Sequence, residues 1–205
     1  MSSPQERAER PGPPPLAGPA LLERAVGYTR TSLQLLEFAD LTASTPCAEW
    51  DLLTLLRHMD DSLAAFTEAA EIGYVDLLPV RTGETAADAA QQVVDRLRRR
   101  ASAVLGAWAH RPGTRAVRVS DRQMRSDLIA AAGALEIAVH GWDVARACGV
   151  DRPLPAALAL ELLDVVPFLV SDADRPRRFA DPVDVPQHAR PGIRLLAAVG
   201  RRSLA

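Results

Sequence analysis

A carboxylate and an imidazole lie four residues apart in the segment 136–143, which reads EIAVHGWD. On a helix this spacing places Glu136 and His140 on one face, one above the other. A second imidazole, His58, lies far upstream on a separate segment with a helical pattern. Two imidazoles and one carboxylate can hold a divalent ion and leave a coordination position open for water or substrate. The chemistry therefore depends on whether these three side chains converge.

Spacing alone is weak evidence, because Glu136 and His140 also fit an ordinary polar pair on a helix, with His58 as a buried or rim histidine. Asp143 follows His140 by one turn, where it either orients the imidazole as a hydrogen-bond acceptor or pairs with Arg146. Both interpretations remain open at this point.

Other residues of interest have a structural and a functional interpretation. Trp50 and Trp142 fit either a pocket wall or the core, and Cys47 fits a small buried thiol better than a nucleophile. The loop residues His110 and His188 are expected at the surface. The arginine run 98–100 is expected on a solvated face, with an anion-binding lip as the alternative.

Helical periodicity dominates the chain from residue 20 onward. Asp51 is the expected N-cap of the helix that carries His58, and Gly149 is the expected stop of the helix that carries Glu136 and His140. Residues 1–19, rich in Pro, Ser, Glu and Arg, are expected to form a disordered tail before a single domain at 20–205. Helices are predicted at about 20–39, 51–71, 84–108, 122–148, 156–170 and 193–199, with at most a short extended piece at 117–119.

The composition bounds the fold and the function class. Apolar residues make up 48% of the 205 residues and aromatics 4%, which favours packed helices over a strand-rich sandwich. The net charge of −2 argues against a nucleic-acid binder that works through a basic field. Cys47 and Cys148 form no metal-binding motif, and neither a secretory signal nor a membrane-spanning run is evident. We therefore expect a soluble cytoplasmic protein, an all-α up-down bundle of four long helices with one or two additional C-terminal helices.

Two separated motifs resemble a known family. The segment 45–59, TPCAEWDLLTLLRHM, is similar to the "TPC..W...LL.H" segment of the DinB-like actinobacterial proteins, which include the mycothiol-dependent maleylpyruvate isomerases and their metal-binding relatives. The segment 136–149, EIAVHGWDVARACG, resembles the "E...HGWD.ARA.G" segment of that family. The C-terminal PVDVP at 182–186, RLL at 194–196 and Gly200-Arg201 also match the tail of the shorter metal-binding branch.

The resemblance implies a DinB-like four-helix bundle in which His58, Glu136 and His140 hold a divalent metal, zinc in the first place and nickel or iron as alternatives. The chain departs from the family pattern at two points that bear on the isomerase reaction. Leu53-Thr54 stands where the family commonly has a polar Arg-Asp-type pair, and the chain is too short for the additional C-terminal domain of the full-length isomerases.

Three functions follow from these observations. The first is an enzyme whose metal activates a low-molecular-weight thiol, with mycothiol as the co-substrate, for addition to, transfer to or isomerisation of a small electrophile. The second is a thiol-independent metalloenzyme of secondary metabolism. The third is a non-catalytic helical module, as a monomer or homodimer. No nucleic-acid or membrane partner is expected.

Overall fold

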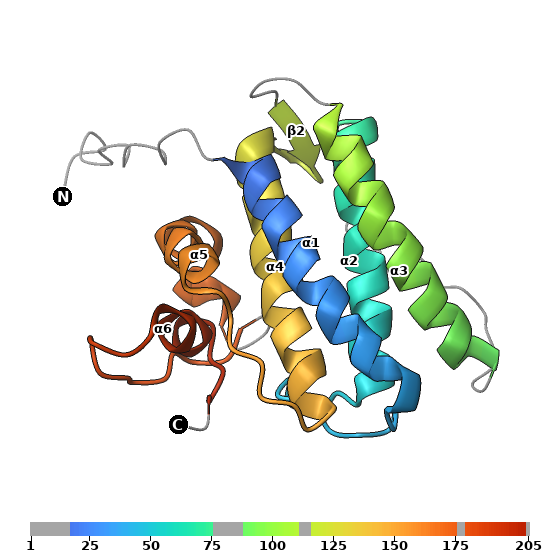
Figure 1. Ribbon diagram of the computed structural model, residues 1–205. Coiled ribbons are helices and arrows are strands. Elements are labelled where there is room, and N and C mark those ends of the chain that lie inside the picture. Colours follow the sequence, from blue (N-terminus) through green and yellow to red (C-terminus); the bar gives the residue numbers. More distant parts are fainter. Residues whose placement is uncertain (1–16, 76–87, 111–115, 176–178, 204–205) are drawn as a thin grey trace.

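The computed structural model describes residues 17–75, 88–110, 116–175 and 179–203 (Figure 1). The four long helices lie side by side, and two shorter helices flank α4. The long helices are α1 (Gly18–Leu33), α2 (Leu52–Glu71), α3 (Asp88–Ala109) and α4 (Ser126–Ala147); the shorter ones are α5 (Ala156–Leu169) and α6 (Pro191–Ala198). Short 3₁₀ turns follow α1 at Gln34–Phe38 and α5 at Asp172–Asp174. The predicted all-α bundle with added C-terminal helices is confirmed.

The two helices that carry the candidate ligands have well-defined ends. Asp51 caps α2, because its Oδ1 accepts from the backbone N–H of Thr54 at 2.8 Å. At the end of α4, Gly149 has a φ of 73°, and the N–H groups of Gly149 and Val150 donate to the carbonyls of Arg146 and Ala145. This pair of bonds is a Schellman motif, so both expected helix ends are confirmed.

The helix directions differ in one respect from the expected up-down order, because they do not alternate between α2 and α3. Followed by colour in Figure 1, α2 and α3 run in the same direction, opposite to α1 and α4. The parallel pairing of the strands that follow α2 and α3 agrees with this arrangement.

A small sheet closes the end of the bundle, where the sequence predicted at most one extended piece. Strands β1 (Tyr74–Val75), β2 (Ala116–Val119) and β3 (Arg122–Arg125) lie in that order, with β1–β2 parallel and β2–β3 antiparallel. The prediction that α4 starts near Arg122 was therefore wrong, since helix begins at Ser126. Two- to four-residue strands carry too little alternation to be recognised.

Two other boundaries differ from expectation. The segment 18–19, assigned to the tail, forms the first turn of α1, where Pro19 fits because its missing N–H has no helical acceptor. Residues 1–16 and the expected start of α3 at 84–87 lie outside the described residues. The closing helix spans Pro191–Ala198, two residues earlier than predicted at its start.

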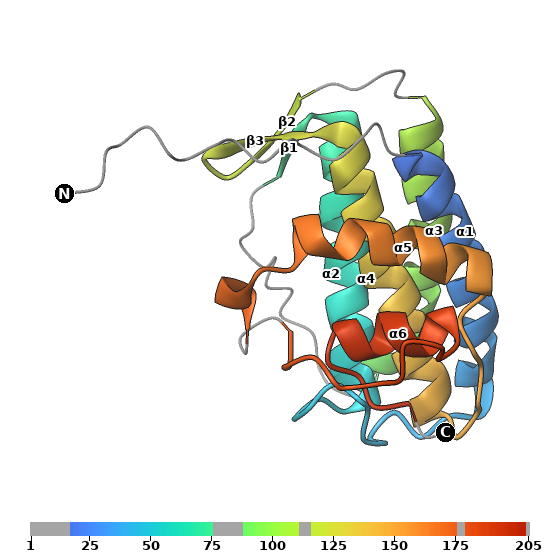
Figure 2. The ribbon, with the colours of Figure 1, turned by 90° about the vertical axis from the view of Figure 1, so that its left-hand side faces the viewer.

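Helix α4 is the core of the bundle. It is long and apolar enough to satisfy a membrane-span criterion, but 83% of its most apolar window is buried by its neighbours, as in the core helix of a folded domain. Helix α1 packs along it closely at Gly141, where an added Cβ would lie 2.2 Å from Oγ1 of Thr29. Figure 2 shows α5 and α6 crossing over the side of the bundle that contains α4.

Candidate metal centre

Helices α2 and α4 bring the three predicted ligands together. Nε2 of His58 lies 2.5 Å from Oε1 of Glu136, and Nε2 of His140 lies 3.2 Å from the same oxygen. One ligand atom from each residue lies within 4.8 Å of the other two. Two imidazole nitrogens and a carboxylate oxygen this close together are a donor set that suits zinc and other first-row divalent ions. The residues present therefore fit the divalent metal that the resemblance in sequence implies.

One side of this cluster is open to solvent. The His58 side chain is 37% exposed and that of Glu136 is 24% exposed, whereas that of His140 is 7% exposed. Ser62, one turn after His58, donates from Oγ to Oε1 of Glu136 at 3.2 Å. A ligand could therefore approach from the His58 side, while His140 is fixed in the interior.

Trp50 lies against both imidazoles. Its ring centroid is 4.8 Å from that of His58 and 6.4 Å from that of His140. Trp142, in contrast, is 2% exposed in the hydrophobic core, with the guanidinium of Arg146 6.0 Å from its ring centroid. Of the two tryptophans, Trp50 is the one that lines the cluster.

The loop before α2 has a fixed conformation. Oγ1 of Thr45 donates to the carbonyls of Cys47 and Trp50 and accepts from the N–H of Cys47. Glu49 adopts a φ of 68°, an uncommon left-handed conformation for a non-glycine residue. These contacts hold the loop in which Cys47 approaches Nδ1 of His140 and Trp50 lies against the two imidazoles.

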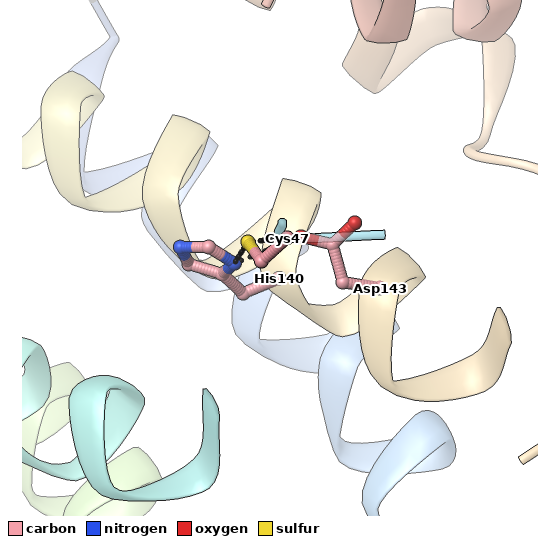
Figure 3. A group of neighbouring side chains, drawn as sticks. All are labelled: Cys47, His140 and Asp143. Carbon is pink, nitrogen blue, oxygen red and sulfur yellow. Dashed lines mark hydrogen bonds and ion pairs between the residues drawn. The ribbon is translucent and has the colours of Figure 1, made fainter. Parts of the chain in front are cut away.

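The other nitrogen of His140 faces a different set of groups. Nδ1 lies 2.9 Å from Oδ2 of Asp143 and 3.9 Å from Sγ of Cys47 (Figure 3). Asp143 is fully buried, while Arg146 pairs with Asp151 at 3.8 Å. Of the two interpretations of Asp143, the structure supports the one in which it orients His140.

Arg201, which follows α6, completes this side of the cluster. Its Nε and one terminal nitrogen lie 3.1 Å from Oδ1 and 3.0 Å from Oδ2 of Asp143. The same terminal nitrogen is 2.8 Å from Sγ of Cys47. In the sequence, Arg201 belongs to the tail that matches the family, but its contacts are not predictable there, because a loop residue outside any helical spacing has no recognisable partner.

Cys47, His140 and Asp143 also lie close enough to one another to hold an ion. However, the guanidinium of Arg201 already occupies the position next to both the sulfur and the carboxylate. A second cation there would meet a fixed positive charge in a buried place, which is unfavourable. The Nε2 side of His140 is therefore a better candidate for metal binding than the Nδ1 side.

The charged forms of Glu136, His140 and Asp143 stabilise one another. Burial alone would raise the pKa of Glu136, but the charge of His140 and hydrogen bonds from both histidines lower it well below its usual value. Burial alone would lower the pKa of His140, but Glu136, Asp143 and Cys47 raise it well above its usual value. The pKa of Asp143 is lowered in spite of its burial, because His140 and Arg201 stabilise its charge.

The remaining sequence candidates lie elsewhere. His110 and His188 are exposed, as expected, and Nδ1 of His110 lies 2.7 Å from the Gly106 carbonyl oxygen. Within the run 98–100, Arg100 donates to the Asp60 backbone carbonyl at 2.8 Å and lies 3.3 Å from its buried carboxylate. That arginine holds α3 to α2, and the expectation of a solvated face does not apply to it.

Comparison with known proteins gives one family. The family sequence model described as the mycothiol maleylpyruvate isomerase N-terminal domain matches residues 22–145, which is more than half of the chain. The matched range contains His58, Glu136, His140 and Asp143 and ends before α5, α6 and Arg201. No curated protein and no solved structure matches the chain.

Proposed function

Since the chain belongs to the mycothiol maleylpyruvate isomerase N-terminal domain family, we propose that it is a divalent-metal-dependent enzyme that activates a low-molecular-weight thiol. Mycothiol is the expected thiol and a small electrophile is the expected substrate. The observation that carries the proposal is the convergence of His58, Glu136 and His140 within 4.8 Å on one open face.

In this proposal His58 and His140 would bind the metal through Nε2 and Glu136 through its carboxylate. A bound divalent ion supplies a Lewis acid that lowers the pKa of a thiol, as it does for water. A free thiol with an ordinary pKa of about 8.5 is only a few per cent thiolate at neutral pH, so the gain in nucleophile concentration is large.

Other contacts around the proposed metal would orient its ligands and form the approach for the substrates. His140 is held in the interior by Asp143, so its Nε2 keeps one direction. Ser62 donates to Glu136 and restrains the carboxylate. The partly exposed His58 and Trp50 form the side from which thiol and electrophile would approach. Thiolate addition to an activated double bond gives a carbanion. Rotation about the former double bond and expulsion of the same thiolate give isomerisation, whereas protonation of the carbanion gives conjugation.

The test uses the zinc-loaded full chain with mycothiol and two probes, maleylpyruvate for isomerisation and a fluorogenic bimane for conjugation. We expect turnover of at least one probe that requires both the metal and the thiol. His58→Ala should abolish it, while Cys47→Ser should leave the metal requirement unchanged. Turnover that is equally fast without mycothiol would favour the thiol-independent metalloenzyme instead.

A second measurement does not depend on the choice of electrophile. In protein loaded with Co²⁺, binding of mycothiol to the metal should add a sulfur-to-cobalt charge-transfer band in the near ultraviolet. An unchanged cobalt spectrum at saturating mycothiol would contradict thiol activation at this site.

A further inference from the structure

We propose that Arg201 is a positioning residue of the metal centre, which holds the carboxylate of Asp143 against Nδ1 of His140. The inference rests on the metal site proposed above. It adds to that site a residue from the C-terminal segment, which lies outside the range 22–145 matched by the family model.

The contact geometry carries the first step. Arg201 approaches Asp143 with two nitrogens, at 3.1 Å to Oδ1 and 3.0 Å to Oδ2, so each carboxylate oxygen has its own donor. A carboxylate on its own rotates easily about its terminal torsion. Two parallel hydrogen bonds from a planar guanidinium remove that freedom, which a point charge would not do.

The second step concerns the imidazole. Oδ2 of Asp143 lies 2.9 Å from Nδ1 of His140, which therefore donates its hydrogen to the carboxylate. Because Asp143 holds the hydrogen on Nδ1, Nε2 is the nitrogen that would release its proton to bind a metal, and it faces Glu136 and His58. By fixing the plane of Asp143, Arg201 fixes both the tautomer and the direction of His140.

The third step concerns the backbone at the end of α6, which positions Arg201 beside Asp143. Helix α6 ends in a Schellman motif, in which Gly200 has a φ of 79° and the N–H of Arg201 donates to the Leu196 carbonyl at 2.8 Å. A Cβ on Gly200 would lie 2.6 Å from the Cβ of Ala180, so a side chain does not fit there. The turn directs Arg201 into the interior, and the contact between Gly200 and Ala180 leaves the backbone little room to move.

Arg201 acts through Asp143 and does not reach the open face. It is 9% exposed, and its side-chain nitrogens lie within hydrogen-bond distance of Asp143, Cys47 and the Val199 carbonyl. The next residue, Arg202, is exposed and lines a shallow hollow with residues 180–184. Arg202 is thus a matched control, an adjacent arginine that does not contact the cluster.

The experiment compares Arg201→Gln, Arg201→Lys and Arg202→Gln in the full chain with two readouts. The first uses metal-free protein labelled with ¹⁵N in histidine and measures the Nδ1–H resonance of His140. We expect a protected, low-field resonance in the unaltered chain and in Arg202→Gln. It should be lost through exchange with water in Arg201→Gln and weakened in Arg201→Lys.

The second readout is metal binding, measured as zinc affinity by chelator competition and as the visible spectrum of bound Co²⁺. Loss of an outer contact to a metal-bound histidine typically lowers affinity about 10–100-fold. We expect a loss of that size in Arg201→Gln, an intermediate loss in Arg201→Lys and none in Arg202→Gln. The cobalt spectrum should shift in the same order, because the direction of the His140 ring changes.

The two readouts separate the two proposals. If the unaltered chain binds no metal, the metal site fails, and the Nδ1–H resonance still decides the role of Arg201. A resonance that is retained in Arg201→Gln, or absent in the unaltered chain, would overturn the inference. If Arg201→Gln does not fold, Arg201→Lys decides instead, and unaltered values of both readouts in that variant would overturn the bidentate positioning.

Discussion

At the scale of single residues, the centre of the molecule is an imidazole whose two nitrogens face different partners. Nε2 of His140 lies 3.2 Å from Glu136, and Nδ1 lies 2.9 Å from Asp143. The ring thus links the solvent-accessible donors to a buried ion pair. The site therefore extends beyond the three proposed ligands, because Asp143 orients the most buried of them.

A pH dependence of metal binding follows from this environment. In the metal-free protein the charge of Glu136 and the hydrogen bond to Asp143 raise the pKa of His140 well above its usual value of about 6.5. The ring is therefore a positively charged imidazolium at neutral pH, with a proton on Nε2 as well as on Nδ1. A metal bound at Nε2 must displace that proton. Below the raised pKa, zinc affinity should therefore rise about tenfold for each pH unit.

Chelator competition at several pH values between about 6 and 8 measures this slope, and proton release on zinc addition in a weakly buffered solution measures the same proton directly. His140→Ala is the control that lacks the titrating ring. An affinity that does not change over the range would show that no protonated histidine is displaced.

At the scale of elements, the site depends on how closely α1 approaches α4. Thr29 donates from Oγ1 to the Ile137 carbonyl at 2.7 Å. An added Cβ at Gly141 would lie 2.2 Å from the same Oγ1 of Thr29. Gly141 directly follows His140, so any displacement of the helices there also moves the proposed ligand.

Gly141→Ala should therefore lower the free energy of unfolding by about 1–3 kcal/mol, the usual cost of overpacking a core. Urea denaturation followed by circular dichroism measures the change. Gly106→Ala is the control, since an added Cβ on that exposed glycine of α3 meets nothing within 4 Å. Alanine favours helix, so the control should be neutral or stabilising by up to about 1 kcal/mol.

Equal stability of the Gly141→Ala and Gly106→Ala variants would contradict the close contact between α1 and α4. Loss of stability in both would show that the effect is not specific to the space around Gly141, since helix propensity by itself favours alanine.

The elements were predictable where their patterns were long. Helical periodicity, the Asp51 cap and the Gly149 stop located α2 and the C-terminal end of α4 closely, because each helix lies in an uninterrupted run of apolar spacing. Strand β2 overlaps the extended piece expected at 117–119, but β1 and β3 were missed because β1 has two residues and the segment Arg122–Arg125 reads as the start of a helix. The parallel course of α2 and α3 is set by tertiary packing, which periodicity does not encode.

At the scale of the whole molecule, three distant parts of the chain build the candidate site. The loop and helix at 45–62 supply Trp50 and His58, α4 supplies Glu136 and His140, and the C-terminal segment supplies Arg201. The first two were found from motifs in the sequence. The Arg201 contact could not be, because its partner lies 58 residues away and the pairing depends on how α5 and α6 fold back onto α4.

Metal binding that joins α2 to α4 should stabilise the whole fold. A ligand at about 100 times its dissociation constant adds about 2.7 kcal/mol to the free energy of unfolding. For a domain of this size, that corresponds to a rise in Tm of about 5–10 °C. Differential scanning fluorimetry with and without zinc measures the shift, and His140→Ala should show none. A similar shift in His140→Ala would mean that zinc binds elsewhere.

The most direct test of the central claim is the metal content of the purified chain, measured by inductively coupled plasma mass spectrometry after dialysis against zinc. A three-ligand centre predicts about one zinc per chain. His58→Ala, Glu136→Ala and His140→Ala should each lose most of that metal, whereas Cys47→Ser should keep it. Equal metal content in the unaltered chain and the three ligand variants would contradict the site, and so would an unaltered chain that retains no zinc.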